Sequence, residues 1–319
     1  MPTEKEIIMR HFYKRPRQAG VCQSIGDDAA ILTLPPDCQL IATMDTLNAG
    51  IHFPLQTDPF SIGYKAAAVN LSDLAAMGAT PLWITLSLSL PALDEEWLAQ
   101  FSQGLFAVLD QFQVDLIGGD LNKGPLSITV QAEGAVPTGT ALLRSGAKVN
   151  DVLYVSGELG TAAVGLRVVQ QQLSLPDTLA ASVLLALNQP MPQITLGKAL
   201  RGIATSAIDL SDGLACDLTQ ICTASGVGAQ IDLAKLPLNA ALQQALSTAP
   251  LLQLALAGGD DYQLCFTAPQ EHAQQIAEIS RELSVKITPI GLITLQSEIT
   301  VLNSAGVIEP LLMQGFEHF

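Results

Sequence analysis

The chain has 319 residues and a mass of 33.6 kDa, a length that predicts two domains. Hydrophobic residues make up 49% of it and charged residues 14%, which excludes an intrinsically disordered chain. The 30 acidic and 15 basic residues give a net charge of −15, whereas proteins that bind nucleic acid or anionic lipid need a basic surface. We therefore expect no nucleic acid and no membrane as partner. An anionic ligand would need divalent cations between its charge and that of the protein.

The cysteines and the start of the chain indicate a cytoplasmic protein. The five cysteines are odd in number and form no CxxC pair, as expected of reduced thiols. The opening MPTEKEIIMRHFYKRPR is charged and lacks the apolar core of a secretory signal. No run of 18 apolar residues is present, so we expect no membrane-spanning helix.

In the first part of the chain, hydrophobic periodicity and helix-start signals predict mixed α and β structure. Asp58-Pro59 is a helix start, with the aspartate as cap, and WITLSLSL alternates as a half-buried strand does. The expected elements are a helix at Glu4–Tyr13, strands at Ala29–Leu34 and Gln39–Asp45, a helix at Pro59–Met77, a strand at Trp83–Leu90, a helix at Leu98–Phe112, and strands at Val114–Ile117 and Leu126–Val136.

Residues 139–148 contain glycines and polar residues typical of a connection. We therefore place an N-terminal domain at 1–138 and a C-terminal α/β domain at 149–319. The elements expected first in the second domain are a strand at Val152–Ser156, a helix at Thr161–Gln172, a strand at Ala207–Leu210, and a helix from Asp212 to Ala224 that stops at Gly226.

The strongest chemical feature is a set of aspartates in apolar or glycine-rich surroundings. A buried carboxylate needs a partner, and the chain has too few bases to pair them all. Hard divalent cations are the alternative, and Mg²⁺ typically binds a few carboxylates together with substrate phosphates. The candidates are Asp27-Asp28, Asp45, Asp73, Asp120, Asp209, Asp212 and Asp260-Asp261.

Other roles compete at single positions. Asp212 could be a helix cap, as Asp58 is, and the Asp-Asp pairs that follow glycine could be plain turns. Asp73 is harder to dismiss because it lies inside an expected helix, where no cap is needed. The chain has no P-loop motif; Gly157-x-x-Gly160 before a helix could offer N–H groups to a phosphate or be an ordinary tight turn.

Nine motifs in a fixed order resemble one enzyme family. They are IGDDAA, the xTxD segment ATMD, AGIHF, YKAAAVNLSDLAAMGA, LIGGD, RSGAKVNDVLYVSG, IDLSDGL, GGDDYQLCF and a terminal GFEHF. Together they are similar to the thiamine-monophosphate kinase family, in the superfamily of aminoimidazole ribotide synthetase and selenophosphate synthetase. The resemblance covers essentially the full length.

The resemblance implies a two-domain α/β (α+β) fold like that of aminoimidazole ribotide synthetase, with N-terminal sheets that pair into a homodimer. It implies ATP-dependent phosphorylation of thiamine monophosphate, with several Mg²⁺ ions per site. Asp73, Asp120 and Asp212 would be catalytic. Gly119, Asp120, Arg144 and Ser211 would contact ATP, and His52, Asp260 and Phe316 the thiamine substrate. The implied metal ligands are Asp28, Thr43, Met44, Asp45, Asp73, Asp120, Asp209 and Asp212.

Three positions depart from the family pattern. Met44 stands where a threonine is usual and can offer only its backbone carbonyl, Asp260 replaces a glutamate, and Gln263 replaces a common glutamate. None removes an obvious ligand set. Two other functions stay open: another ATP-using enzyme of the superfamily, such as an aminoimidazole ribotide synthetase, and a non-catalytic acidic metal-binding protein.

Overall fold

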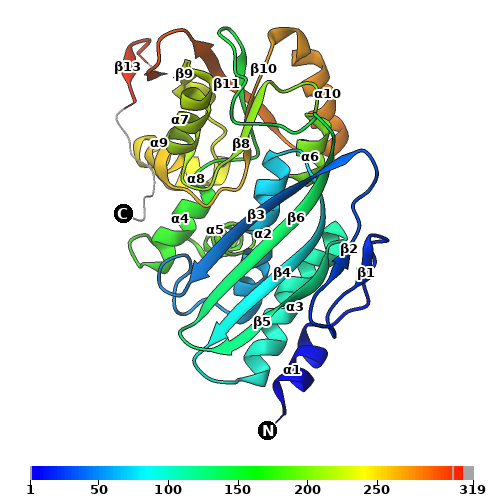
Figure 1. Cartoon of the computed structure of the whole chain (residues 1–319). Coiled ribbons are helices and arrows are strands. Elements are labelled where there is room, and N and C mark those ends of the chain that lie inside the picture. The colour runs from blue at the N-terminus through cyan, green and yellow to red at the C-terminus, as the bar shows by residue number, and fades with distance from the viewer. Residues whose placement is uncertain (1, 304, 312–319) are drawn as a thin grey trace. The chain divides into compact units, whose positions relative to one another are not determined.

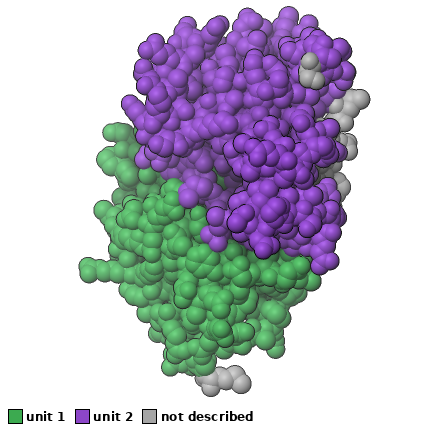
Figure 2. Space-filling model, turned by 180° about the vertical axis from the view of Figure 1, so that it is seen from behind, with its two compact units in different colours: residues 1–74, 79–139 green, residues 75–78, 140–319 purple. Residues whose placement is uncertain are grey.

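The computed structural model describes residues 2–303 and 305–311, which form two compact units (Figures 1 and 2). Unit 1 comprises residues 1–74 and 79–139; unit 2 comprises residues 75–78 and 140–319. Among the described residues, no helix has both the length and the apolar character needed to cross a membrane.

Unit 1 is a four-stranded sheet of order β3-β6-β4-β5, with β4 and β5 parallel and the other neighbours antiparallel. A separate pair of short strands, β1 and β2, follows the first helix. Its elements are α1 (Glu4–His11), β1 (Val21–Gln23), β2 (Ile31–Leu32), β3 (Cys38–Asn48), α2 (Pro59–Ala76), β4 (Thr80–Leu90), α3 (Glu95–Phe112), β5 (Asp115–Lys123) and β6 (Ser127–Pro137).

Helices α2 and α3 cover one face of this sheet (Figure 1). They cross closely because each has a glycine where the other brings its backbone. A Cβ at Gly63 of α2 would lie 2.0 Å from the carbonyl oxygen of Phe101, and one at Gly104 of α3 would lie 1.8 Å from that of Phe60. The start of α2 is the one expected, since the Ser61 N–H donates to Asp58 Oδ1 at 2.9 Å.

Unit 2 is built on a sheet of order β13-β12-β9-β11-β7-β10-β8, in which only β12 and β9 pair in parallel among the described strands. Its buried core includes Leu153, Val155 and Cys265. Its elements are β7 (Val152–Ser156), α4 (Thr161–Val169), α5 (Asp177–Asn188), α6 (Ile194–Ala199), β8 (Ser206–Asp209), α7 (Leu214–Ser225), β9 (Gly228–Asp232), η1 (Leu233–Lys235), α8 (Ala240–Ala245), α9 (Thr248–Ala257), β10 (Leu264–Ala268), η2 (Gln270–His272), α10 (Ala273–Leu283), β11 (Ile287–Thr294), β12 (Ile299–Leu302) and β13 (Ile308–Pro310).

Most predicted elements are present, and the errors lie at their ends. The strand at Val152–Ser156 is confirmed to the residue. Helix α4 ends at Val169, short of the predicted Gln172, because Gln171 has a left-handed φ of 58°. Helix α7 starts at Leu214 after Gly213, whose φ is 109°, so Asp212 precedes the helix instead of opening it.

Replacing Gly104 by alanine should destabilise unit 1, although alanine is the better helix former. The new methyl group would press on the Phe60 carbonyl of α2, and we expect the free energy of unfolding to fall by about 1–3 kcal/mol. Urea unfolding of Gly104→Ala measures this. The control is Gln103→Ala at the exposed neighbouring position, which should not lose stability. Equal stability of the two variants would contradict the close crossing.

Candidate active site

Asp73 and two residues of β3 form an oxygen-rich cluster in unit 1. Thr43 Oγ1 donates to Asp73 Oδ2 at 2.5 Å, and the Asp45 N–H donates to Asn70 Oδ1 at 3.0 Å. The Asn70 side-chain amide donates in turn to the carbonyl oxygen of Ala66, one turn earlier in α2. The cluster therefore fixes two of the predicted metal ligands, Thr43 and Asp73, against each other.

The Met44 side chain lies on the opposite face of β3 from this cluster. Thr43 and Asp45 extend toward α2, and alternation sends the Met44 side chain to the other face, where it is 63% exposed. The Met44 side chain therefore has no part in the cluster around Asp73. Only its main chain could contribute a ligand, as the thioether itself is a poor ligand for a hard cation.

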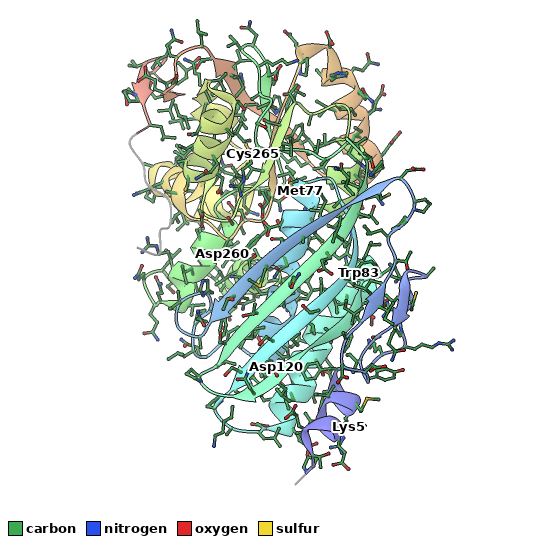
Figure 3. The ribbon with its side chains drawn as sticks, in the orientation of Figure 1. Lys5, Met77, Trp83, Asp120, Asp260 and Cys265 are labelled. Atoms are coloured by element: carbon green, nitrogen blue, oxygen red, sulfur yellow. The ribbon has the colours of Figure 1, made fainter. Side chains whose placement is uncertain are left out.

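Asp120 also extends from the face opposite the Asp73 cluster. It lies on β5, which the sequence prediction ended at Ile117 (Figure 3). In the sheet register Asp120 pairs with Ser87, Ser87 with Thr129, and Thr129 with Thr46, which neighbours Asp45 on β3. Residues paired across strands share a face, so Asp120 shares the outer face with Thr46. The predicted ligands of unit 1 are thus divided between two faces of one sheet.

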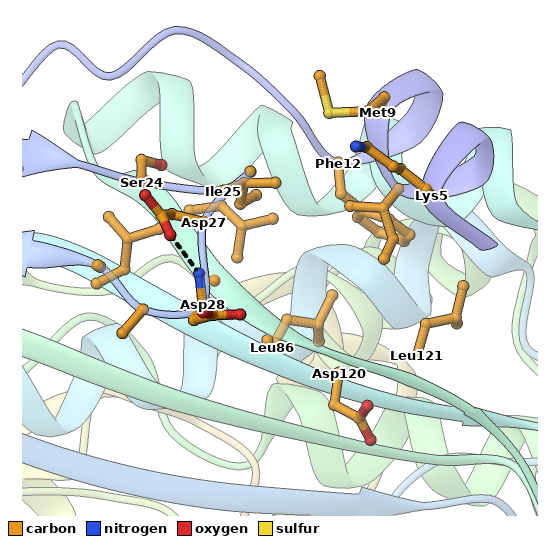
Figure 4. A pocket seen from close by; sticks show the side chains of 18 of the residues that line it. Lys5, Met9, Phe12, Ser24, Ile25, Asp27, Asp28, Leu86, Asp120 and Leu121 are labelled. Atoms are coloured by element: carbon orange, nitrogen blue, oxygen red, sulfur yellow. Dashed lines mark hydrogen bonds between the residues drawn. The ribbon is translucent and has the colours of Figure 1, made fainter.

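A cavity of about 480 Å³ brings together Asp28, Gly119 and Asp120 (Figure 4). Lys5 of α1 and Asp27 also line it. Asp27 and Asp28 form a turn in which the Asp28 N–H donates to Asp27 Oδ1 at 2.9 Å. Asp27 and Asp28 therefore form a turn, as the sequence allowed, and they also line this cavity.

Ser24 adds a polar group to the same cavity. Its hydroxyl is buried and has no hydrogen-bond partner among the described residues. The sequence analysis did not single out Ser24, and a lone serine before a glycine-rich turn gives no signal that could have found it.

His52 is held at the end of β3. The Asn48 N–H donates to His52 Nδ1 at 3.0 Å, so Nδ1 is the acceptor and the ring proton of the neutral imidazole lies on Nε2. The backbone thus selects the tautomer that presents a donor at Nε2.

In unit 2, two loops bring together the aspartates at the ends of β8 and α9. The Asp260 N–H donates to the carbonyl oxygen of Ser211 at 2.9 Å, and the Tyr262 N–H donates to that of Leu210 at 2.8 Å. Asp209 is the last residue of β8 and is buried. These main-chain bonds place Asp209, Ser211, Asp212 and Asp260 in neighbouring segments.

Asp217 of α7, which the sequence analysis missed, supports the first of these loops. It is 3% exposed, and its Oδ2 accepts the N–H groups of Asp212 and Gly213, each at 3.1 Å. Burial, and next the charge of Asp212, raise the pKa of Asp217 to about 7. Ligand atoms of Asp212, Cys216 and Asp217 lie within 4.8 Å of one another. The sequence signal that could have indicated Asp217 is a second aspartate five residues after Asp212, inside an apolar helix.

Asp261 was predicted to be either a candidate metal ligand or part of a plain turn, and its carboxylate is buried. It accepts the Gly160 N–H, at 3.0 Å to Oδ1 and 2.9 Å to Oδ2. The Gly160 N–H is therefore already bonded within the protein. The prediction that Gly160 of the Gly157-x-x-Gly160 segment offers this N–H to a phosphate is wrong. Burial raises the pKa of Asp261 to about 8.

Two further residues were predicted to contact the substrates. Arg144 is exposed, and its carbonyl oxygen accepts from Ser225 Oγ at 3.3 Å. Phe316 lies outside the described residues.

The raised pKa of Asp261 predicts a pH dependence of stability. A carboxyl group that binds its proton more tightly in the folded state makes the free energy of unfolding fall as pH rises, here between about 4, the usual aspartate pKa, and about 8. Asp261→Asn cannot titrate, so the melting temperature of wild type relative to this variant should decrease across that range. Parallel pH profiles of the two proteins would contradict the raised pKa.

Comparison with known proteins identifies the family. Residues 26–140 match the N-terminal domain of the AIR synthase related proteins and residues 148–302 match their C-terminal domain. The chain is 45% identical to thiamine-monophosphate kinase of Escherichia coli K12 over 99% of its length and 98% of that protein. The crystal structure of thiamine-monophosphate kinase from Stenotrophomonas maltophilia superposes with a TM-score of 0.86 at 44% identity, covering 89% of this chain and 92% of that one.

A further solved structure, AaThiL complexed with AMPPCP and TMP, matches with a TM-score of 0.80 at 29% identity, covering 93% of this chain and 92% of that one. The expected two-domain α+β fold is confirmed by these matches together with the mixed sheets and helices of both units. The chain belongs to the thiamine-monophosphate kinase family of the AIR synthase related proteins.

Proposed function

We propose that this protein transfers the γ-phosphoryl group of ATP to thiamine monophosphate and so forms thiamine diphosphate and ADP. The supporting relatives are named thiamine-monophosphate kinase over nearly the whole chain, and one solved relative is complexed with AMPPCP and TMP. The observation that carries the proposal to this chain's own residues is the Asp73–Thr43 hydrogen bond beside Asp45, an oxygen cluster of the kind that binds metal–phosphate complexes.

The donor set fits Mg²⁺, a hard cation that takes oxygen ligands. Carboxylates and a hydroxyl supply these in unit 1, and carboxylates do so in unit 2. The residues that would hold several ions are Asp28, Thr43, Asp45, Asp73, Asp120, Asp209 and Asp212, with Met44 through its main-chain oxygen. When bound, Mg²⁺ offsets the repulsion between the two anionic substrates and the acidic protein.

The remaining residues would bind and orient the two substrates. Gly119, Asp120, Arg144 and Ser211 would contact ATP, and His52, Asp260 and Phe316 would contact thiamine monophosphate. His52 would donate from Nε2, the tautomer that Asn48 selects. The attacking phosphate oxygen is already ionised near neutral pH, so no strong general base is required, and direct in-line transfer without a phospho-enzyme is expected.

We also propose a homodimer formed through the open face of the unit 1 sheet. Leu40, 47% exposed, and Met44 are large apolar side chains on this face, and a second copy would remove both from water. Asp120 lies on the same face and Asp73 on the other, so a site that needs both carboxylates would take them from two copies.

An ADP-release assay tests the reaction. ADP should form with ATP, thiamine monophosphate and Mg²⁺ together, and chelation of the metal should abolish it. The configuration at a chiral γ-phosphorus should invert in a direct in-line transfer. ADP release only with the substrate of aminoimidazole ribotide synthetase would favour the other superfamily activity, and none with either substrate would favour a metal-binding protein. Net retention at phosphorus would contradict direct transfer.

Asp73→Asn and Asp120→Asn test the proposed site. Each should lose at least about 99% of turnover while remaining folded, because an amide is a weaker ligand for a hard cation. Glu96→Gln, an exposed acid of α3, is the matched control and should keep wild-type turnover.

Mixing the two inactive variants tests the shared site. Random reassociation makes half of the dimers mixed and each mixed dimer has one intact site, so roughly a quarter of wild-type activity should return. If turnover stays absent in every mixture of properly reassociated dimers, the two carboxylates act within one copy.

A further inference from the structure

The loop that carries Asp260 has an uncommon backbone. Gly259, Asp260 and Tyr262 all have left-handed φ values, 69°, 61° and 47°. For residues with side chains this conformation is costly, and it persists only where surrounding contacts enforce it. Some contact must therefore hold this loop in place.

Asp261, which lies between Asp260 and Tyr262, makes one such contact through its carboxylate. Both of its carboxylate oxygens accept the Gly160 N–H, and the Ala162 N–H also bonds to it. Gly160 precedes α4 with a φ of 78° and has no side chain to cap that helix. The Asp261 carboxylate therefore caps α4 from a loop distant in sequence, where the helix start favours an acceptor.

Main-chain bonds join the same loop to the segment that follows β8. The N–H groups of Asp260 and Tyr262 reach the carbonyls of Ser211 and Leu210. On the far side, Ser156 Oγ donates to Gln263 Oε1 at 2.8 Å. Asp261 is thus the side chain that ties the Asp260 loop to the start of α4, while main-chain bonds tie it to the loop after β8.

We propose that Asp261 is a positioning residue that sets the place of Asp260 and thereby the affinity for thiamine monophosphate. This inference rests on the proposed function, in which Asp260 contacts that substrate. Loss of the Gly160 anchor releases the left-handed turn, and Asp260 moves from the position that the substrate requires. Asp261 itself acts through Asp260.

The test compares Michaelis constants of the full-length protein for its two substrates. Asp261→Asn keeps one acceptor and similar volume, and should raise KM for thiamine monophosphate by about tenfold, with KM for ATP changed less than about twofold. Asp261→Ala should raise the same KM further. Asp151→Asn is the matched control, a buried carboxylate of unit 2 that accepts the Lys148 N–H and the Thr205 hydroxyl, and should leave both constants near wild type.

A double-mutant cycle separates positioning from a general loss of structure. If Asp261 acts through Asp260, adding Asp261→Asn to Asp260→Ala should raise KM little beyond the single Asp260→Ala variant. Multiplicative effects, or equal rises in both Michaelis constants, would overturn the positioning role. Calorimetric binding of thiamine monophosphate to folded Asp261→Asn gives the same comparison if the alanine variant does not fold.

The same variants also separate the positioning role of Asp261 from the substrate contact of Asp260. A raised KM in Asp260→Ala with unchanged constants in both Asp261 variants overturns the positioning role and leaves the proposed function intact. Unchanged constants in all variants overturn the contact between Asp260 and thiamine monophosphate as well, while ADP release in the wild type still reports on the reaction itself.

Discussion

The desolvation of carboxylates is the constraint on which the candidate site depends. Charged side chains are few, and acids outnumber bases 30 to 15, so ion pairs cannot hold every aspartate that the fold draws inward. Hydroxyl and main-chain groups donate to three of them: Thr43 to Asp73, the N–H groups before α7 to Asp217, and Gly160 to Asp261. Such bonds offset part of the cost of burial without adding a competing cation.

This choice of donors matters for a site that must attract metal ions. The Thr43 hydroxyl that donates to Asp73 carries no charge of its own, so this bond leaves the negative charge of the carboxylate in place. The Asp212 loop is likewise held through a main-chain group, because the Asp212 N–H donates to Asp217 Oδ2. Both bonds use uncharged donors and so add no positive charge beside the candidate ligands.

The sequence predicted the elements better than it predicted the geometry of the site. Local patterns sufficed for β7 and for the start of α2, where alternation and the Asp58 cap act within a few residues. The opposite faces of Asp120 and Asp73 could not be predicted, because they depend on the register of four strands and on the extension of β5 past Gly119. The predicted strand ended at Ile117, before the two glycines of LIGGD, because glycine weakens the interior of a strand.

The roles of Asp217 and Asp261 were hidden for a related reason. Asp217 lies five residues after Asp212, and Asp261 directly follows Asp260. In both cases the more exposed aspartate drew the functional interpretation. Their partners, Gly213 and Gly160, carry no side chain and so give no sequence signal of a hydrogen bond. Only the tertiary structure shows that a glycine at a helix start takes its cap from elsewhere.

Rigid support from the main chain is well matched to phosphoryl transfer. Because the reaction needs little covalent chemistry from the protein, its rate depends on how accurately charged groups are held before the substrates arrive. A carboxylate anchored on N–H groups of a helix start has few rotamers left to lose, whereas a long lysine or glutamate side chain must be ordered at each binding event. A short, backbone-anchored aspartate at position 261 beside a strained turn therefore favours a preorganised site, and that is the property that the acidic loops of unit 2 share.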